Sequence, residues 1–124
     1  MTEAPAYDES NVFARILRGE IPCEKVLETE HALAFADVNP QAPVHVLVIP
    51  KGAYVDLTDF LARAPAAERI GLADAVAATV AKLGVAASGY RILANCGPDA
   101  QQEVPHLHWH ILAGERLGPI RARG

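Results

Sequence analysis

Polar and apolar residues alternate along residues 106–111, and histidine takes every polar position. A period of two is the signature of a β-strand whose side chains point to two opposite faces. The pattern predicts a strand over residues 104–113 with His106, His108 and His110 on one face. The other face would present three apolar residues to a core, namely Leu107, Trp109 and Ile111.

Two other segments show the spacing of an amphipathic helix. Residues 11–18 have apolar side chains on one helical face, with Asn11 as N-cap and Gly19 as the stop. Residues 66–83 carry an apolar stripe at steps of three and four, and Gly84 ends it. We therefore expect two helices.

Short apolar runs predict the remaining strands, which turn-rich loops at 37–43 and 96–102 help to separate. Besides 104–113, we expect strands over 25–28, 32–36, 45–50 and 90–95. The order of helix, three strands, helix and two strands predicts an α+β fold. Its core would be a five-stranded antiparallel sheet with both helices packed on one side.

Length and composition predict a single globular domain. The chain has 124 residues, of which 51% are hydrophobic and 21% charged, and its formal net charge is −4. We expect a flexible tail over residues 1–10 and one domain over 11–124. Lys and Arg form no dense cluster, and no apolar run approaches the ~20 residues that cross a bilayer. Neither nucleic acid nor a membrane is therefore an expected partner.

The two cysteines and the polar N-terminus indicate the cellular compartment in which the protein resides. Cys23 and Cys96 match no metal-binding or redox spacing, and nothing in the sequence requires a disulfide. Residues 1–11 are polar and acidic, unlike a signal peptide. The sequence predicts a cytoplasmic protein with two thiols.

Three imidazoles in a row could bind a metal ion, bind phosphate, or carry out nucleophilic and proton-transfer chemistry. A metal site would need further ligands, and His45 at the start of a buried strand is the candidate. A neutral imidazole is also a good nucleophile near pH 7, because its unperturbed pKa is about 6.5. His31 falls in a predicted turn and is given no chemical role.

These residues carry a resemblance to a known family. Residues 106–112, His-Leu-His-Trp-His-Ile-Leu, match the signature of the histidine triad (HIT) superfamily. Residues 39–51, Asn-Pro-Gln-Ala-Pro-Val-His-Val-Leu-Val-Ile-Pro-Lys, are similar to a second block of its Hint branch, and the likeness extends over about residues 11–118. The resemblance implies a HIT-like fold, a homodimer, and hydrolysis of purine nucleoside 5′-phosphoramidates without a cofactor.

The resemblance also implies roles for individual residues. His108 would be the nucleophile that forms a nucleotidyl-histidine intermediate, while His45 and His110 would orient it or touch phosphate. His106 belongs to the same catalytic set, and the proton donor could be His45, His106 or His110. Asp37 would bind the ribose, although it could equally form an Asx turn before Pro40. The remaining nucleotide-binding candidates lie near the phosphate or just before the triad, namely Asn95, Gln102, Glu103 and Val104.

The chain departs from the family pattern at two sites. Many relatives hold a structural zinc with ligands where this chain has Asn11, Ala14 and Ala53, so we expect no zinc there. Glu103 stands where relatives often have a serine facing the phosphate, so its carboxylate should point away or contact an amine leaving group. Trp109 replaces an aliphatic residue and is expected in the core.

Three alternative functions stay open on the sequence. The first is hydrolysis of dinucleoside polyphosphates. The second is a nucleotide-binding or interaction module whose catalysis is vestigial. The third is a metal-binding protein that uses His45 together with the triad.

Overall fold

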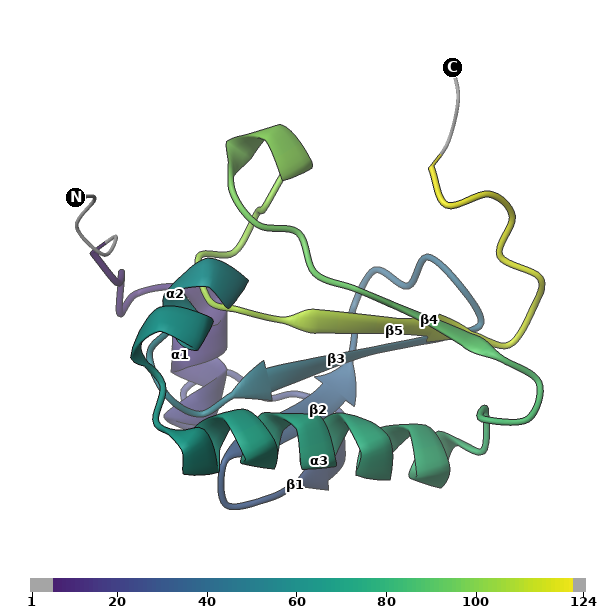
Figure 1. The fold of residues 1–124 in the computed structure, drawn as a ribbon, viewed down its shortest axis with the longest axis horizontal. Coiled ribbons are helices and arrows are strands. Elements are labelled where there is room, and N and C mark those ends of the chain that lie inside the picture. Colours follow the sequence, from purple (N-terminus) through teal and green to yellow (C-terminus); the bar gives the residue numbers. More distant parts are fainter. Residues whose placement is uncertain (1–5, 122–124) are drawn as a thin grey trace.

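The computed structural model describes residues 6–121, which form one sheet flanked by helices (Figure 1). The elements, in chain order, are α1 (Val12–Leu17), β1 (Lys25–Glu28), β2 (Ala32–Ala36), β3 (Val44–Pro50), α2 (Leu57–Arg63), α3 (Ala66–Leu83), β4 (Tyr90–Leu93), the short 3₁₀ helix η1 (Pro98–Ala100) and β5 (Trp109–Ala113). The strand order is β1-β2-β3-β5-β4, and every neighbouring pair is antiparallel. The predicted five-stranded antiparallel sheet is confirmed.

The alternation of side chains along β3 divides the core into two layers. Val46 and Val48 belong to the larger cluster, which lies between the sheet and α3. Leu47 and Ile49 point to the opposite face, where they join a smaller cluster that includes Phe13 of α1. The expectation of both helices on one side is therefore wrong. Helix α1 covers the other face because its aromatic residue packs there.

Two predicted strands are shorter in the structure. The strand expected over 104–113 begins only at Trp109, and the strand expected over 90–95 ends at Leu93. The backbone N–H of His106 bonds to the Val104 carbonyl, and that of Leu107 bonds to the Tyr54 carbonyl, so residues 104–107 do not join the ladder. The faces were nevertheless predicted correctly, because Leu107, Trp109 and Ile111 all pack in the larger cluster.

Helix α2 was not expected, and its ends explain its presence. The Asp56 side chain caps it by accepting from the Asp59 N–H at 2.9 Å. Arg63 then bonds to the buried Asp59 carboxylate one turn earlier, at 2.6 and 3.0 Å. Such caps and i,i+4 pairs stabilise this helix of seven residues, in which Leu57, Phe60 and Leu61 have the i, i+3, i+4 spacing of one helical face.

The structure describes part of the N-terminal tail and both cysteines. Residues 1–5 of the expected tail lie outside the described residues, whereas residues 7–11 make defined contacts. Cys23 and Cys96 are both free thiols. Between residues 6 and 121, no helix is both long and apolar enough to cross a membrane.

Candidate active site

His108 is held with one ring nitrogen bonded and the other free. Its Nδ1 lies 2.8 Å from the backbone carbonyl oxygen of His106. Since a carbonyl oxygen only accepts, Nδ1 must carry the proton, and Nε2 keeps its lone pair. Among the described residues, no hydrogen bond involves that Nε2. The side chain has the tautomer that a nucleophilic imidazole needs.

His45 and His110 form a second chain of hydrogen bonds across neighbouring strands. The backbone N–H of Gln41 donates to Nδ1 of His45 at 2.9 Å, so the His45 proton is on Nε2. That Nε2 lies 2.9 Å from Nδ1 of His110 and 3.4 Å from Oδ2 of Asp37. His110 therefore accepts at Nδ1 and carries its own proton on Nε2.

The Nε2 atom of His110 is buried, and it is without a hydrogen-bond partner in the described part of the chain. A buried donor without a partner is costly unless a ligand satisfies it. His110 lines the same clefts as His108. We interpret this N–H as a donor for an anionic group bound next to His108.

His106 points away from both clefts. Its side chain is fully buried, and Nε2 lies 2.8 Å from the carbonyl oxygen of Pro50. Its Nδ1 lies 2.5 Å from the hydroxyl of Tyr7. With both nitrogens bonded inside the protein, His106 orients His108 through its backbone carbonyl rather than by touching a ligand.

Two clefts meet at His108. One is polar, about 340 Å³, and includes Asn39, Asn95 and Gln101 in its lining. The other is about 430 Å³ and mainly apolar, with walls that include Phe13, Ile16 and Phe35. Five residues line both clefts, namely Asp37, Asn39, Glu103, His108 and His110.

Asp37 both shapes this junction and faces it. Its Oδ1 accepts from the Asn39 N–H at 2.8 Å, which is the Asx turn that the sequence allowed. Its Oδ2 faces His45. A carboxylate can accept about four hydrogen bonds, so it retains capacity for a ligand.

The structure separates the other nucleotide-binding candidates. Asn95 lines the polar cleft, Val104 the apolar one, and exposed Glu103 both. Gln102 lines neither, because its amide holds loops together: it donates to the carbonyls of Val55 and Val104 and accepts from the Gly97 N–H.

The sequence reasoning missed the apolar wall from α1 and the role of one backbone amide. Phe13 packs edge-on against the His108 ring, with centroids 5.0 Å apart. Its place in an amphipathic helix was visible in the sequence, but the sheet face that it would cover was not. The Gln41 amide that fixes His45 carries no side-chain signal at all.

Comparison with known proteins identifies the family. Residues 18–117 match the family model of the HIT domain. The chain belongs to the HIT family. It is 68% identical to a 13.2 kDa HIT-like protein of Azospirillum brasilense, over 98% of this chain and 99% of the relative. It is 39% identical to the purine nucleoside phosphoramidase of Escherichia coli, over 92% of this chain and 95% of that protein.

Solved structures agree with this assignment. A histidine triad protein from Clostridium difficile superimposes with a TM-score of 0.81 at 39% identity, covering 94% of this chain and 100% of that one. A HIT family hydrolase from Clostridium thermocellum superimposes with a TM-score of 0.82 at 40% identity, covering 90% and 96%.

Burial favours the neutral form of four histidines of this HIT domain, namely His45, His106, His108 and His110. It lowers the pKa of His106 and of His110 to about 4, and it lowers the pKa of His45 and His108 in the same direction. The Asp37 carboxylate opposes this effect for every one of them except His106. Near pH 7 the imidazoles are therefore unprotonated bases, as nucleophilic attack requires.

A metal ion has one candidate position in the described residues. Ligand atoms of Asp37, His45 and His110 lie within 4.8 Å of one another. However, the His45–His110 hydrogen bond and the Gln41 amide already engage three of the four ring nitrogens there. At two of the positions where the resemblance implied zinc ligands in relatives, the Ala14 N–H donates to the Asn11 side chain at 2.9 Å, which is the N-cap bond of α1. The side-chain atoms of Asp37, His45 and His110 are therefore arranged for hydrogen bonds to one another rather than for coordination of a metal ion.

Proposed function

We propose that this protein is a purine nucleoside 5′-phosphoramidate hydrolase that works through a nucleotidylated His108. The observation that carries the proposal is the free Nε2 of His108 at the junction of an apolar and a polar cleft. Similarity to the Escherichia coli purine nucleoside phosphoramidase supports the choice of substrate class.

The two clefts suit the two ends of a nucleotide. A flat apolar base fits the walls formed by Phe13, Ile16 and Phe35, which include two aromatic rings. Asp37 would accept hydrogen bonds from the ribose hydroxyls at the junction. The α-phosphate would then lie beside His108 and His110, with Asn95 on the polar side.

The reaction would proceed by two displacements at phosphorus. Nε2 of His108 attacks the α-phosphorus, and a P–N bond to histidine forms while the P–N bond to the amine breaks. The leaving nitrogen takes a proton from solvent as it departs as a neutral amine, and the water of the second displacement returns that proton. The imidazolium that develops is stabilised because Nδ1–H already donates to the His106 carbonyl. The Nε2–H of His110 would donate to a phosphoryl oxygen as charge builds. Water then attacks the same phosphorus, which releases the nucleoside monophosphate and regenerates His108.

Glu103 would act on the amine leaving group. Its carboxylate is exposed at the junction of the two clefts, and its charge opposes the lowering of the His108 pKa. A carboxylate repels a phosphate oxygen, but it attracts an ammonium group. Turnover of Glu103→Ser on a neutral and on a cationic phosphoramidate tests this role, because an unchanged preference would exclude Glu103 from it.

The central experiment follows release of AMP from adenosine 5′-phosphoramidate, with and without a chelator. We expect chelator-resistant turnover, an adenylyl adduct on His108 by mass spectrometry after acid-free trapping, and a loss of more than about 1,000-fold in His108→Ala. His31→Ala, a histidine outside both clefts, is the matched control and should retain full activity.

Other outcomes would point to the alternatives. Faster turnover of a diadenosine polyphosphate would favour the dinucleotide substrate. Tight nucleotide binding without turnover would indicate a binding module, and stoichiometric metal with chelator-sensitive behaviour would indicate a metal site.

We further propose that two copies of the chain form a homodimer. An apolar groove of about 320 Å³ lies between α2, α3 and the sheet, and its lining includes Trp109 and Leu61, which is 57% exposed. Strand β4 is at the edge of the sheet, so one side of it is unpaired in the described part of the chain. Edges and apolar patches of this kind are common contact surfaces between subunits. A cytoplasmic location stays a prediction.

A further inference from the structure

The segment before α1 reaches the back of the histidine row. The hydroxyl of Tyr7 lies 2.5 Å from Nδ1 of His106, although the two residues are 99 positions apart in sequence. Their rings meet edge-on, with centroids 5.6 Å apart and an interplanar angle of 69°. The contact is therefore both polar and aromatic.

The direction of this hydrogen bond follows from the other side of the ring. Nε2 of His106 faces the Pro50 carbonyl, which can only accept, so the His106 proton is on Nε2. Nδ1 must then accept, and the Tyr7 hydroxyl donates to it. Burial raises the pKa of Tyr7, which keeps the phenol protonated and able to donate. Because His106 is fully buried, water cannot replace the Tyr7 hydroxyl as the donor to Nδ1.

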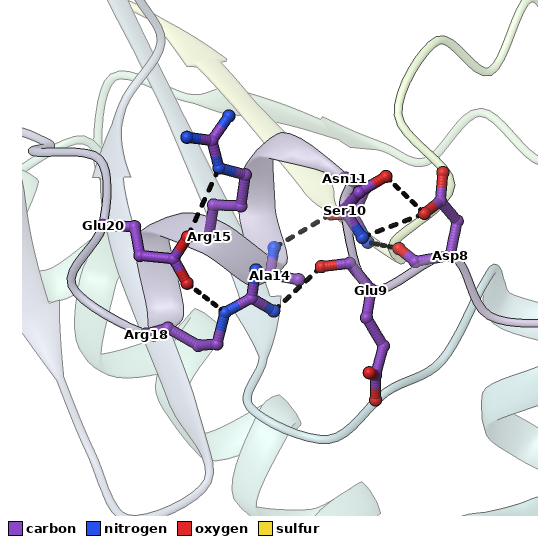
Figure 2. A network of polar contacts seen from close by, with 8 residues as sticks. All are labelled: Asp8, Glu9, Ser10, Asn11, Ala14, Arg15, Arg18 and Glu20. Carbon is purple, nitrogen blue, oxygen red and sulfur yellow. Dashed lines mark hydrogen bonds and ion pairs between the residues drawn. The ribbon is translucent and has the colours of Figure 1, made fainter.

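The residues that follow Tyr7 form an anchored piece of chain (Figure 2). The Asp8 carboxylate accepts from the Ser10 N–H at 2.9 Å and from its hydroxyl at 2.5 Å. The Asp8 carbonyl accepts from the Asn11 side chain at 2.7 Å, and Arg18 of α1 donates to the Glu9 carbonyl at 2.8 Å. These bonds tie residues 8–11 to α1 and fix where Tyr7 can lie.

We propose that Tyr7 is a positioning residue for His108 and acts through His106. It holds the orientation of the His106 ring, whose tautomer the Pro50 carbonyl of β3 sets. The carbonyl of His106 then stands where it accepts the Nδ1–H of His108. The N-terminal segment would thus be part of the active-site framework, although it touches neither cleft.

The test compares Tyr7→Phe with Tyr90→Phe. Phenylalanine keeps the ring and removes only the hydroxyl, and Tyr90 is an exposed tyrosine on β4 that lines neither cleft at His108. The first readout is the ¹⁵N–¹H correlation spectrum of the histidine rings, which reports tautomers directly. In Tyr7→Phe we expect the His106 Nδ1 resonance to move to that of an unbonded acceptor and the His108 ring to populate a second tautomer. Tyr90→Phe should match the unsubstituted protein.

The second readout is kinetic, and it rests on the proposed function. With adenosine 5′-phosphoramidate, kcat of Tyr7→Phe should fall on the order of 10-fold, since the nucleophile is misplaced for part of the time, while KM stays within about twofold. Asp8→Ala, which loosens the anchor but keeps the hydroxyl, should show a smaller fall in kcat. The pH profile of kcat in Tyr7→Phe should also shift, which loss of stability alone would not produce.

Three results bear differently on the two proposals. Unchanged His106 and His108 resonances in Tyr7→Phe would overturn the positioning role, whatever the activity. Lowered stability with unchanged kcat and pH profile would overturn it too, because Tyr7 would then serve only the fold. If the unsubstituted protein does not turn the substrate over, the proposed function fails, and the ring spectra of His106 and His108 alone decide the role of Tyr7.

Discussion

Acidification from pH 7 to pH 5 should weaken the fold through His106. This ring is fully buried, and burial lowers its pKa from 6.5 to about 4. The unfolded chain therefore binds a proton near pH 6.5, while the folded protein resists protonation until about pH 4. Stability is fully present above the higher of these values and is lost as the pH falls between them.

The size of the effect follows from the shift. Each pKa unit corresponds to about 1.4 kcal/mol, so this histidine alone should cost about 2 kcal/mol of unfolding free energy between pH 7 and pH 5. His110, His45 and His108 have lowered pKa values as well, so the total loss should be larger. A variant that removes only one titrating ring is needed to isolate the His106 part.

Urea unfolding of the unsubstituted protein and of His106→Asn at pH 7 and pH 5 supplies the comparison. The variant should be less stable at pH 7. Between pH 7 and pH 5, however, its free energy of unfolding should fall by about 2 kcal/mol less than that of the unsubstituted protein. Titration of the His106 ring proton by NMR measures the folded-state pKa independently. Equal declines in both proteins, or a His106 pKa near 6.5, would refute the reasoning.

Two further predictions concern packing and assembly. A Cβ at Gly71 of α3 would lie 2.5 Å from Cδ2 and 2.8 Å from Cβ of His31. Gly71→Ala should therefore lower the free energy of unfolding by about 1 kcal/mol, although alanine has the better helix propensity. Adding His31→Ala should reverse this loss, as measured by urea unfolding. A stabilised single variant would contradict this. Sedimentation should show a dimer, and Leu61→Asp should raise its dissociation constant by at least about 10-fold. Thr58 is exposed on the same helix but lies outside the groove, so Thr58→Asp should leave the dimer intact. A monomer at all concentrations would exclude the homodimer.

Local patterns were enough to predict most of the fold. The alternation at residues 106–111 fixed which side chains face the core, even though the strand itself begins only at Trp109. Helices α1 and α3 were predicted from apolar spacing together with one cap each, the Asn11 N-cap of α1 and the Gly84 C-cap of α3. Helix α2 was missed although Asp56 is a common N-cap residue and Leu57, Phe60 and Leu61 have helical spacing, so its signals were present in the sequence. The face that α1 covers depends on the packing of Phe13 and Phe35, and no local rule gives it.

The candidate site was predictable only where its residues bear chemistry at recognisable positions. His45, His108, His110 and Asp37 do line one polar cleft, together with Glu103. Gln102 looked equally suited to bind a ligand, but its amide N–H groups donate to the Val55 and Val104 carbonyls. Tyr7 gave no signal, because a hydrogen bond over 99 positions leaves no periodicity behind.

The roles of the three histidines follow from what binds the second nitrogen of each ring. A carbonyl at Nδ1 makes His108 a base at Nε2, whereas a donated proton at Nδ1 makes His110 a donor at Nε2. His106 has partners at both nitrogens and is left with neither property. In the proposed mechanism, identical side chains at alternate positions thus serve as a nucleophile, a donor and a support. Exchanging the partners, rather than the histidines, should therefore be enough to change the chemistry of the row.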